Sequence, residues 1–213
     1  MAKIFSGAAR VGLARFVDPV ARGLLRAGIS PDVVTVLGTV GVLVGALGFG
    51  ARGQFLIAVA IVVAFAPIDM IDGAMARARG YSTRFGALLD STMDRIADGA
   101  IFGSVAFWYA TTGQFVTMAV ALVCVVAAQV ISYVKARAQS LGFECEVGIA
   151  ERGERLVLIG VGALLTGVGV AWALPAALWL LAVLSVITVG QRVGHVYRAD
   201  RQSGRPESTG GER

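Results

Sequence analysis

Long apolar runs constrain this chain more than any other feature. A helix needs about 20 apolar residues to cross the hydrocarbon core of a membrane, and six runs approach that length. Of the 213 residues, 56% are hydrophobic and 15% are charged, which is well below the roughly 25% charge of soluble domains. This balance excludes a soluble globule and a disordered chain. We predict an all-α bundle with six transmembrane helices, over residues 32–51, 54–78, 86–111, 115–138, 154–172 and 176–197.

A short amphipathic helix is predicted ahead of the first run. Asp18 and Pro19 resemble an N-cap and the first position of a helix, and Gly28 a C-terminal stop. Between them, over about residues 19–27, apolar and basic side chains fall on opposite faces. Such a helix is expected to lie in the membrane interface. The alternative is a solvated helix that packs on the bundle.

The basic residues predict the orientation of the chain. If the six spans alternate, all 19 lysines and arginines except Arg52 lie on one side, together with all 14 acidic residues. The positive-inside rule places both termini and any chemistry in the cytoplasm, at the cell membrane. The positive charge then contacts anionic lipid headgroups and is not a sign of nucleic-acid binding. We predict one membrane domain over residues 1–198 and a disordered cytoplasmic tail over 199–213.

Four carboxylates form the most informative pattern. Asp69 and Asp72 are three residues apart at the end of the second run, and Asp90 and Asp94 are four apart at the start of the third, so each pair shares a helix face. The two helices are antiparallel neighbours, and the acidic faces can meet. Four buried, unpaired charges would be very costly. Protonation, pairing with arginine or binding of divalent cations would each resolve the conflict.

The chemistry of the cluster favours a metal, but other uses remain open. Oxygen ligands without histidine or cysteine select hard ions such as Mg²⁺, Mn²⁺ or Ca²⁺. Two such ions would balance four carboxylates and suit phosphoryl transfer. Ion or proton transport and a structural network with nearby arginines are the alternatives. The role of Asp98, one turn beyond Asp94, is not defined by this pattern.

The spacing of this segment carries a resemblance. Eight fixed residues, Asp69-x2-Asp72-Gly73-x2-Ala76-Arg77-x8-Gly86-x3-Asp90-x3-Asp94, match the signature of the CDP-alcohol phosphotransferase family. The resemblance implies an enzyme that uses a CDP-linked lipid, forms a phosphodiester with an alcohol and releases CMP. It also implies that Asp69, Asp72, Asp90 and Asp94 bind two divalent ions, Mg²⁺ or Mn²⁺, and that Asp94 is the general base.

The resemblance also suggests residues for the nucleotide. Gly73 and Arg77 would contact the cytidine diphosphate, and Thr83 in the following loop would add a contact. The first predicted span opens with Asp32, Val33, Val34 and Thr35, and a helix N-terminus suits a phosphate group. The family places nucleotide contacts at this segment. The alternative is that it serves only as a helix cap.

The remaining cytoplasmic cations suggest a phosphorylated acceptor. A pocket for the acceptor phosphate is predicted from six residues at the depth of the carboxylates: Ser132, Lys135, Arg137, Arg152, Arg155 and Arg192. Ordinary positive-inside charges would look similar. The lone histidine, His195, is more typical of an interfacial residue than of a ligand.

Segments outside the signature refine the resemblance. QVISYVKARAQSLG, IAERGERL and SPDVVT are similar to those of actinobacterial phosphatidylinositol phosphate synthases. This implies transfer of the phosphatidyl group of CDP-diacylglycerol to inositol phosphate, by a homodimer among membrane lipids. The alternative within the family is phosphatidylglycerophosphate synthase, with glycerol 3-phosphate as acceptor.

Overall fold

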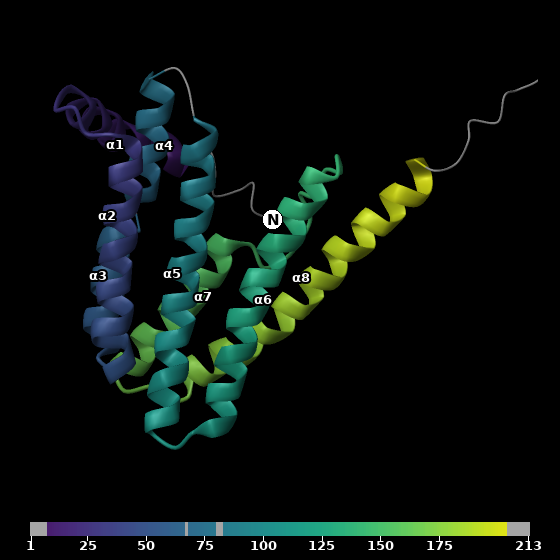
Figure 1. Cartoon of the computed structure of the whole chain (residues 1–213). Coiled ribbons are helices and arrows are strands. Elements are labelled where there is room, and N and C mark those ends of the chain that lie inside the picture. Colours follow the sequence, from purple (N-terminus) through teal and green to yellow (C-terminus); the bar gives the residue numbers. More distant parts are fainter. Residues whose placement is uncertain (1–7, 67, 80–82, 204–213) are drawn as a thin grey trace, which may run out of the picture. The chain divides into compact units, whose positions relative to one another are not determined.

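The computed structural model describes residues 8–66, 68–79 and 83–203 (Figure 1). The side chains of residues 8–16, Asp69 and Ser203 fall outside this description. Over the described ranges every regular element is a helix, which confirms the predicted all-α class there. The chain divides into two compact units, Met1–Trp108 and Tyr109–Arg213.

Five α-helices build the first unit. α2 continues directly through a π-helical segment, Val44–Phe49, and one 3₁₀ turn, Gly50–Arg52. The helices are α1 (Ala8–Arg26), α2 (Pro31–Leu43), α3 (Phe55–Phe65), α4 (Ile68–Arg79) and α5 (Arg84–Thr111), of which the last three residues belong to the second unit. α2 packs against both α3 and α4 (Figure 1).

The predicted start of the N-terminal helix is wrong. α1 begins at Ala8, and Pro19 lies inside it. The proline removes one backbone donor, but the helix continues because the buried Val17 and Ala21 pack against Val34 of α2 and Met75 of α4. The predicted stop at Gly28 is correct, because this residue adopts a positive φ of 77°, for which glycine has no steric penalty.

Close helix packing in the first unit depends on small residues along α2. A Cβ at Gly38 would lie 2.8 Å from the Cγ2 atom of Ile68, and one at Gly41 would overlap the ring of Phe65. A third glycine, Gly45, faces Ile61 in the same way. Small residues allow helix backbones to approach in a membrane, where packing drives association.

The second unit contains three helices, α6 (Phe115–Ser140), α7 (Arg152–Gly167) and α8 (Ala173–Ser203). α8 packs against both α6 and α7. It continues to Ser203, so residues 199–203 are helical and the predicted disordered tail begins too early. The Arg201 guanidinium lies 5.6 Å from the Tyr197 ring centroid, an i,i+4 contact that favours the last turns. The rest of the predicted tail, 204–213, lies outside the described residues.

Four helical segments in the described ranges are long and apolar enough to cross a membrane. They are Pro31–Arg52, Phe55–Arg79, Phe115–Ser140 and Ala173–Gln202. The third and fifth predicted spans correspond to α5 and α7, which do not qualify: charged residues cluster in the first half of α5, and α7 has only 16 residues. The four apolar segments indicate that the chain is an integral membrane protein.

Candidate active site

A pocket in the first unit joins the predicted carboxylate and nucleotide residues. It has a volume of about 250 Å³ and is formed by α2, α4, α5 and the residue before α5. Its lining consists of Pro31, Asp32, Thr35, Asp72, Gly73, Ala76, Arg79, Thr83, Gly86, Ala87 and Asp90. Residues of α2 thus meet residues of the consecutive helices α4 and α5 in one cavity.

Two helix N-termini border this pocket. At α2, the Ser30 hydroxyl accepts a hydrogen bond from the Val33 N–H at 3.3 Å, and Pro31 is the first helical residue. At α5, the Thr83 hydroxyl accepts from the Gly86 N–H at 2.9 Å. Both are local caps that the sequence dictates. The positive ends of two helix dipoles therefore point toward a cavity suited to phosphate groups.

Two of the four predicted metal ligands lie in the pocket. Asp72 of α4 is buried with 7% of its surface exposed, and its carboxylate accepts a hydrogen bond from the Thr35 hydroxyl. Asp90 of α5 is partly buried in the same lining. With Asp32 of α2, the pocket therefore presents carboxylates from three helices, and carboxylate oxygen is the ligand type that Mg²⁺ and Mn²⁺ prefer.

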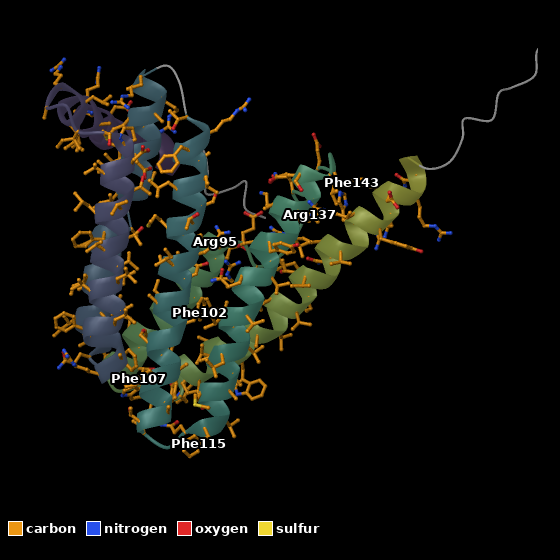
Figure 2. The ribbon with its side chains drawn as sticks, in the orientation of Figure 1. Arg95, Phe102, Phe107, Phe115, Arg137 and Phe143 are labelled. Carbon is orange, nitrogen blue, oxygen red and sulfur yellow. The ribbon has the colours of Figure 1, made fainter. Side chains whose placement is uncertain are left out.

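The other two predicted ligands are placed less completely. Asp69 lies on α4, three residues before Asp72, but its side chain is outside the described part. Asp94 lies one turn after Asp90 on α5, where Arg95 (labelled in Figure 2) donates to its carboxylate at 3.4 Å. Among the described side chains, no group of three or more aspartate, glutamate, histidine or cysteine residues is arranged to hold a metal. Asp98, one turn further, is buried with 1% exposed.

The predicted nucleotide residues divide into two groups. Asp32, Thr35, Gly73 and Thr83 all line the pocket. The others do not. Val33 is exposed, Val34 is buried in the apolar cluster with α1 and α4, and Arg77 is exposed, with its Nη1 atom 3.5 Å from the position of a Cβ on Gly73.

Sequence reasoning did not identify every residue of the lining. Arg79 was missed, although it follows Asp72 and Ala76 at helical spacing, a signal that places it on the same face of α4. Gly86 was seen only as part of the signature. A Cβ there would lie 2.9 Å from the Thr83 Oγ1 and 3.2 Å from the Asp32 Oδ1, so glycine allows α2 and α5 to approach at the pocket.

The predicted acceptor residues all lie in the second unit. Arg155 is buried and donates from Nη1 to the Ala150 carbonyl at 3.0 Å. Arg192 is buried and donates to the carbonyls of Val147 and Ile131, at 2.8 and 2.6 Å. Both guanidinium groups thus hold backbone at the segment between α6 and α7.

Lys135 and the three remaining residues are more accessible. The Lys135 Nζ lies 2.8 Å from the Glu146 carboxylate. This hydrogen bond and the lysine charge hold the pKa of Glu146 below its ordinary value. Ser132 and Arg152 are partly buried. Arg137 is exposed and, with Phe143, lines a mostly apolar pocket of about 470 Å³ (Figure 2).

Comparison with known proteins connects these features. The family model for CDP-alcohol phosphatidyltransferase matches residues 28–190, which include the pocket and the basic residues up to Arg155. The chain belongs to this family.

Similar members of the family share one name. The phosphatidylinositol phosphate synthase of Mycobacterium marinum is 49% identical over 195 residues, 88% of this chain and 82% of that protein. The Streptomyces avermitilis protein of the same name is 46% identical, over 92% of this chain and 83% of its own length. The crystal structure of the Mycobacterium tuberculosis enzyme with CDP-DAG bound is 43% identical, with a TM-score of 0.83, and the comparison covers 94% of this chain and all of that one.

Proposed function

We propose that this family member is a phosphatidylinositol phosphate synthase. It transfers the phosphatidyl group of CDP-diacylglycerol to inositol phosphate and releases CMP. The observation that carries the proposal is the pocket in which Asp72 and Asp90 meet two helix N-termini. The relatives named phosphatidylinositol phosphate synthase, one of them solved with CDP-DAG bound, support the choice of donor and acceptor.

Divalent ions fit the donor set of the pocket. We infer that Asp72 and Asp90, with Asp69 and Asp94 on the same two helices, hold two Mg²⁺ or Mn²⁺ ions. A relative at 42% identity was solved with manganese and citrate, which supports the metal class. Such ions would offset the negative charge of the pyrophosphate and of the departing CMP.

The residues of the chain supply positioning and proton transfer. An acceptor hydroxyl oxygen attacks the lipid-side phosphorus, the bond from this phosphorus to the bridging oxygen breaks, and CMP leaves with that oxygen. The Asp94 carboxylate takes the hydroxyl proton. Asp32, Thr35, Gly73 and Thr83, which line the pocket, bind the donor, and the α2 and α5 N-termini orient its phosphates.

The acceptor phosphate is assigned to the basic residues of the second unit. Ser132, Lys135, Arg137, Arg152, Arg155 and Arg192 are proposed to bind it. Arg155 and Arg192 are buried, and a desolvated guanidinium forms strong charge-assisted bonds with phosphate. Free inositol and serine carry no phosphate group for these cations to bind.

The same proposal includes an arrangement in the membrane. We propose six spans, with α5 and α7 completing the four apolar ones. The termini and the pocket face the cytoplasm of a plasma-membrane homodimer, and α1 lies at the lipid interface. In such a topology every lysine and arginine except Arg52 lies on one side, which supports this orientation.

The test is CMP release by the purified protein with CDP-diacylglycerol and Mg²⁺. Inositol phosphate, free inositol, glycerol 3-phosphate and serine are offered separately. Release with inositol phosphate alone is expected. Release with glycerol 3-phosphate alone would keep the chemistry and overturn the acceptor, whereas no release from folded, metal-loaded protein would favour a transporter.

A further inference from the structure

One face of α8 holds the segment between α6 and α7 at several points. The Arg192 Nε donates to the Val147 carbonyl at 2.8 Å, and the His195 Nε2 lies 3.1 Å from the Glu144 carbonyl oxygen. Further along the segment, just before α7, the Thr188 hydroxyl accepts hydrogen bonds from the backbone N–H groups of Ile149 and Ala150. α8 thus fixes the path of a segment that has no regular structure of its own.

Thr188 is the most completely engaged of these side chains. It is fully buried, and its Oγ1 accepts from the N–H groups of Ile149 at 3.3 Å and Ala150 at 3.0 Å. The same hydroxyl donates to the Leu184 carbonyl at 2.8 Å. One donor and two acceptor sites are all that a hydroxyl offers, so its full capacity is used.

The segment is shaped to accept this threonine. Gly148 has a φ of 140°, which side-chain-bearing residues rarely adopt. A Cβ there would lie 2.7 Å from the Thr188 Cγ2 atom. Backbone conformation and close approach therefore both require glycine opposite Thr188.

Ala150 connects Thr188 to a proposed acceptor residue. Its N–H donates to Thr188, and its carbonyl accepts from the Arg155 Nη1 at 3.0 Å. Arg155 is 2% exposed and sits in the first turn of α7. The backbone of Ala150 thus links the Thr188 hydroxyl of α8 to the Arg155 guanidinium of α7.

We propose that Thr188 is a positioning residue for the acceptor phosphate, acting through Ala150 on Arg155. This inference rests on the proposed function, in which Arg155 binds that phosphate. Without the hydroxyl, the buried Ala150 N–H and the part-buried Ile149 N–H lose their acceptor, and the cost of leaving the buried group unsatisfied favours a shifted segment. The Ala150 carbonyl then no longer aligns the guanidinium for the phosphate.

The test separates acceptor binding from donor binding. In Thr188→Val, the KM for inositol phosphate should rise about tenfold, the effect of losing roughly one good hydrogen bond, while the KM for CDP-diacylglycerol stays unchanged. Thr188→Ser should restore the wild-type value. Ser185→Ala is the matched control, because it removes an equally buried hydroxyl one turn earlier on α8.

A second variant and a second readout keep the test decisive. Gly148→Ala disturbs the same contact from the segment side and should give the same KM pattern. Amide hydrogen exchange of residues 144–151 should accelerate in Thr188→Val and Gly148→Ala but not in Ser185→Ala. This readout needs no turnover.

Three results would count against these statements. Equal acceptor KM values in Thr188→Val and Ser185→Ala would overturn the positioning role, even if exchange accelerates. Unchanged exchange would overturn the contact itself. If the wild type releases no CMP with inositol phosphate, the proposed function fails and the positioning role with it, and exchange alone then reports on the contact.

Discussion

The Thr35 hydroxyl of α2 donates a hydrogen bond to the Asp72 carboxylate of α4, joining residues 37 positions apart. Both side chains are buried at the pocket, with 8% and 7% of their surfaces exposed. A buried carboxylate held in this way keeps one orientation toward the cavity. The family signature contains Asp72 but not Thr35. The contact therefore shows that Thr35 orients a carboxylate of the pocket.

We predict that Thr35→Val weakens divalent-metal binding about tenfold or more. Outer contacts that orient a metal ligand commonly contribute 10–100-fold in affinity. Titration of the purified protein with Mn²⁺, followed by electron paramagnetic resonance, measures the effect without turnover. Thr35→Ser keeps the hydroxyl and should bind as the wild type does. Equal Mn²⁺ affinity in Thr35→Val and the wild type would show that the hydroxyl does not orient Asp72 for metal.

Asp94→Asn should reduce CMP release at least a hundredfold, because the amide cannot accept the acceptor proton. The measurement is the initial rate with saturating CDP-diacylglycerol and inositol phosphate. Asp18→Asn, on the exposed face of α1, is the control and should retain full activity. A near-normal rate in folded Asp94→Asn would remove Asp94 as the base.

Much of this site could be predicted from sequence because its information is local. The spacing of Asp72 and Asp90 places each on a defined helix face, and Thr83 precedes α5 as a cap. Contacts between segments that are distant in the sequence leave no spacing pattern from which they could be predicted. Nothing in the sequence joins Thr35 to Asp72 or Thr188 to Ala150.

In the fold, too, local sequence patterns predict some features, while others depend on packing between distant residues. The positions of the long helices follow from apolar runs, and the stop at Gly28 follows from its chemistry. The start of α1 was misplaced because Asp18 and Pro19 resemble a cap, while packing of Val17 and Ala21 carries the helix through the proline. The end of α8 was misplaced because polar residues read as disordered also form good helical turns.

Gly86→Ala should raise the KM for CDP-diacylglycerol about tenfold or more. The added Cβ would lie 2.9 Å from the Thr83 Oγ1 and 3.2 Å from the Asp32 Oδ1, so the cap or the carboxylate must move at the pocket. Overpacking of this kind costs about 1–3 kcal/mol. Gly103→Ala on the same helix is the matched control, since a Cβ there meets no atom of the described chain within 4 Å. Equal donor KM values for the two variants would contradict the proposed donor contact.

Glu146→Gln should lower the KM for inositol phosphate about twofold to fivefold, the usual range for an accessible ion pair. The Glu146 carboxylate lies 2.8 Å from the Lys135 Nζ, where it competes with an incoming phosphate and repels it.

The hydrogen bond with Lys135 lowers the pKa of Glu146, so this carboxylate stays charged above the ordinary carboxyl pKa and loses its charge only as the pH falls through the lowered value. The ratio of wild-type to variant KM should therefore be constant from pH 7 to pH 8, where Glu146 stays charged and a phosphate monoester, with a second pKa of about 6, is almost fully doubly charged. Glu144→Gln, which removes the same charge from the same segment, should leave the KM nearly unchanged. A raised KM in Glu146→Gln would instead mean that this carboxylate binds the acceptor, through its hydroxyl groups.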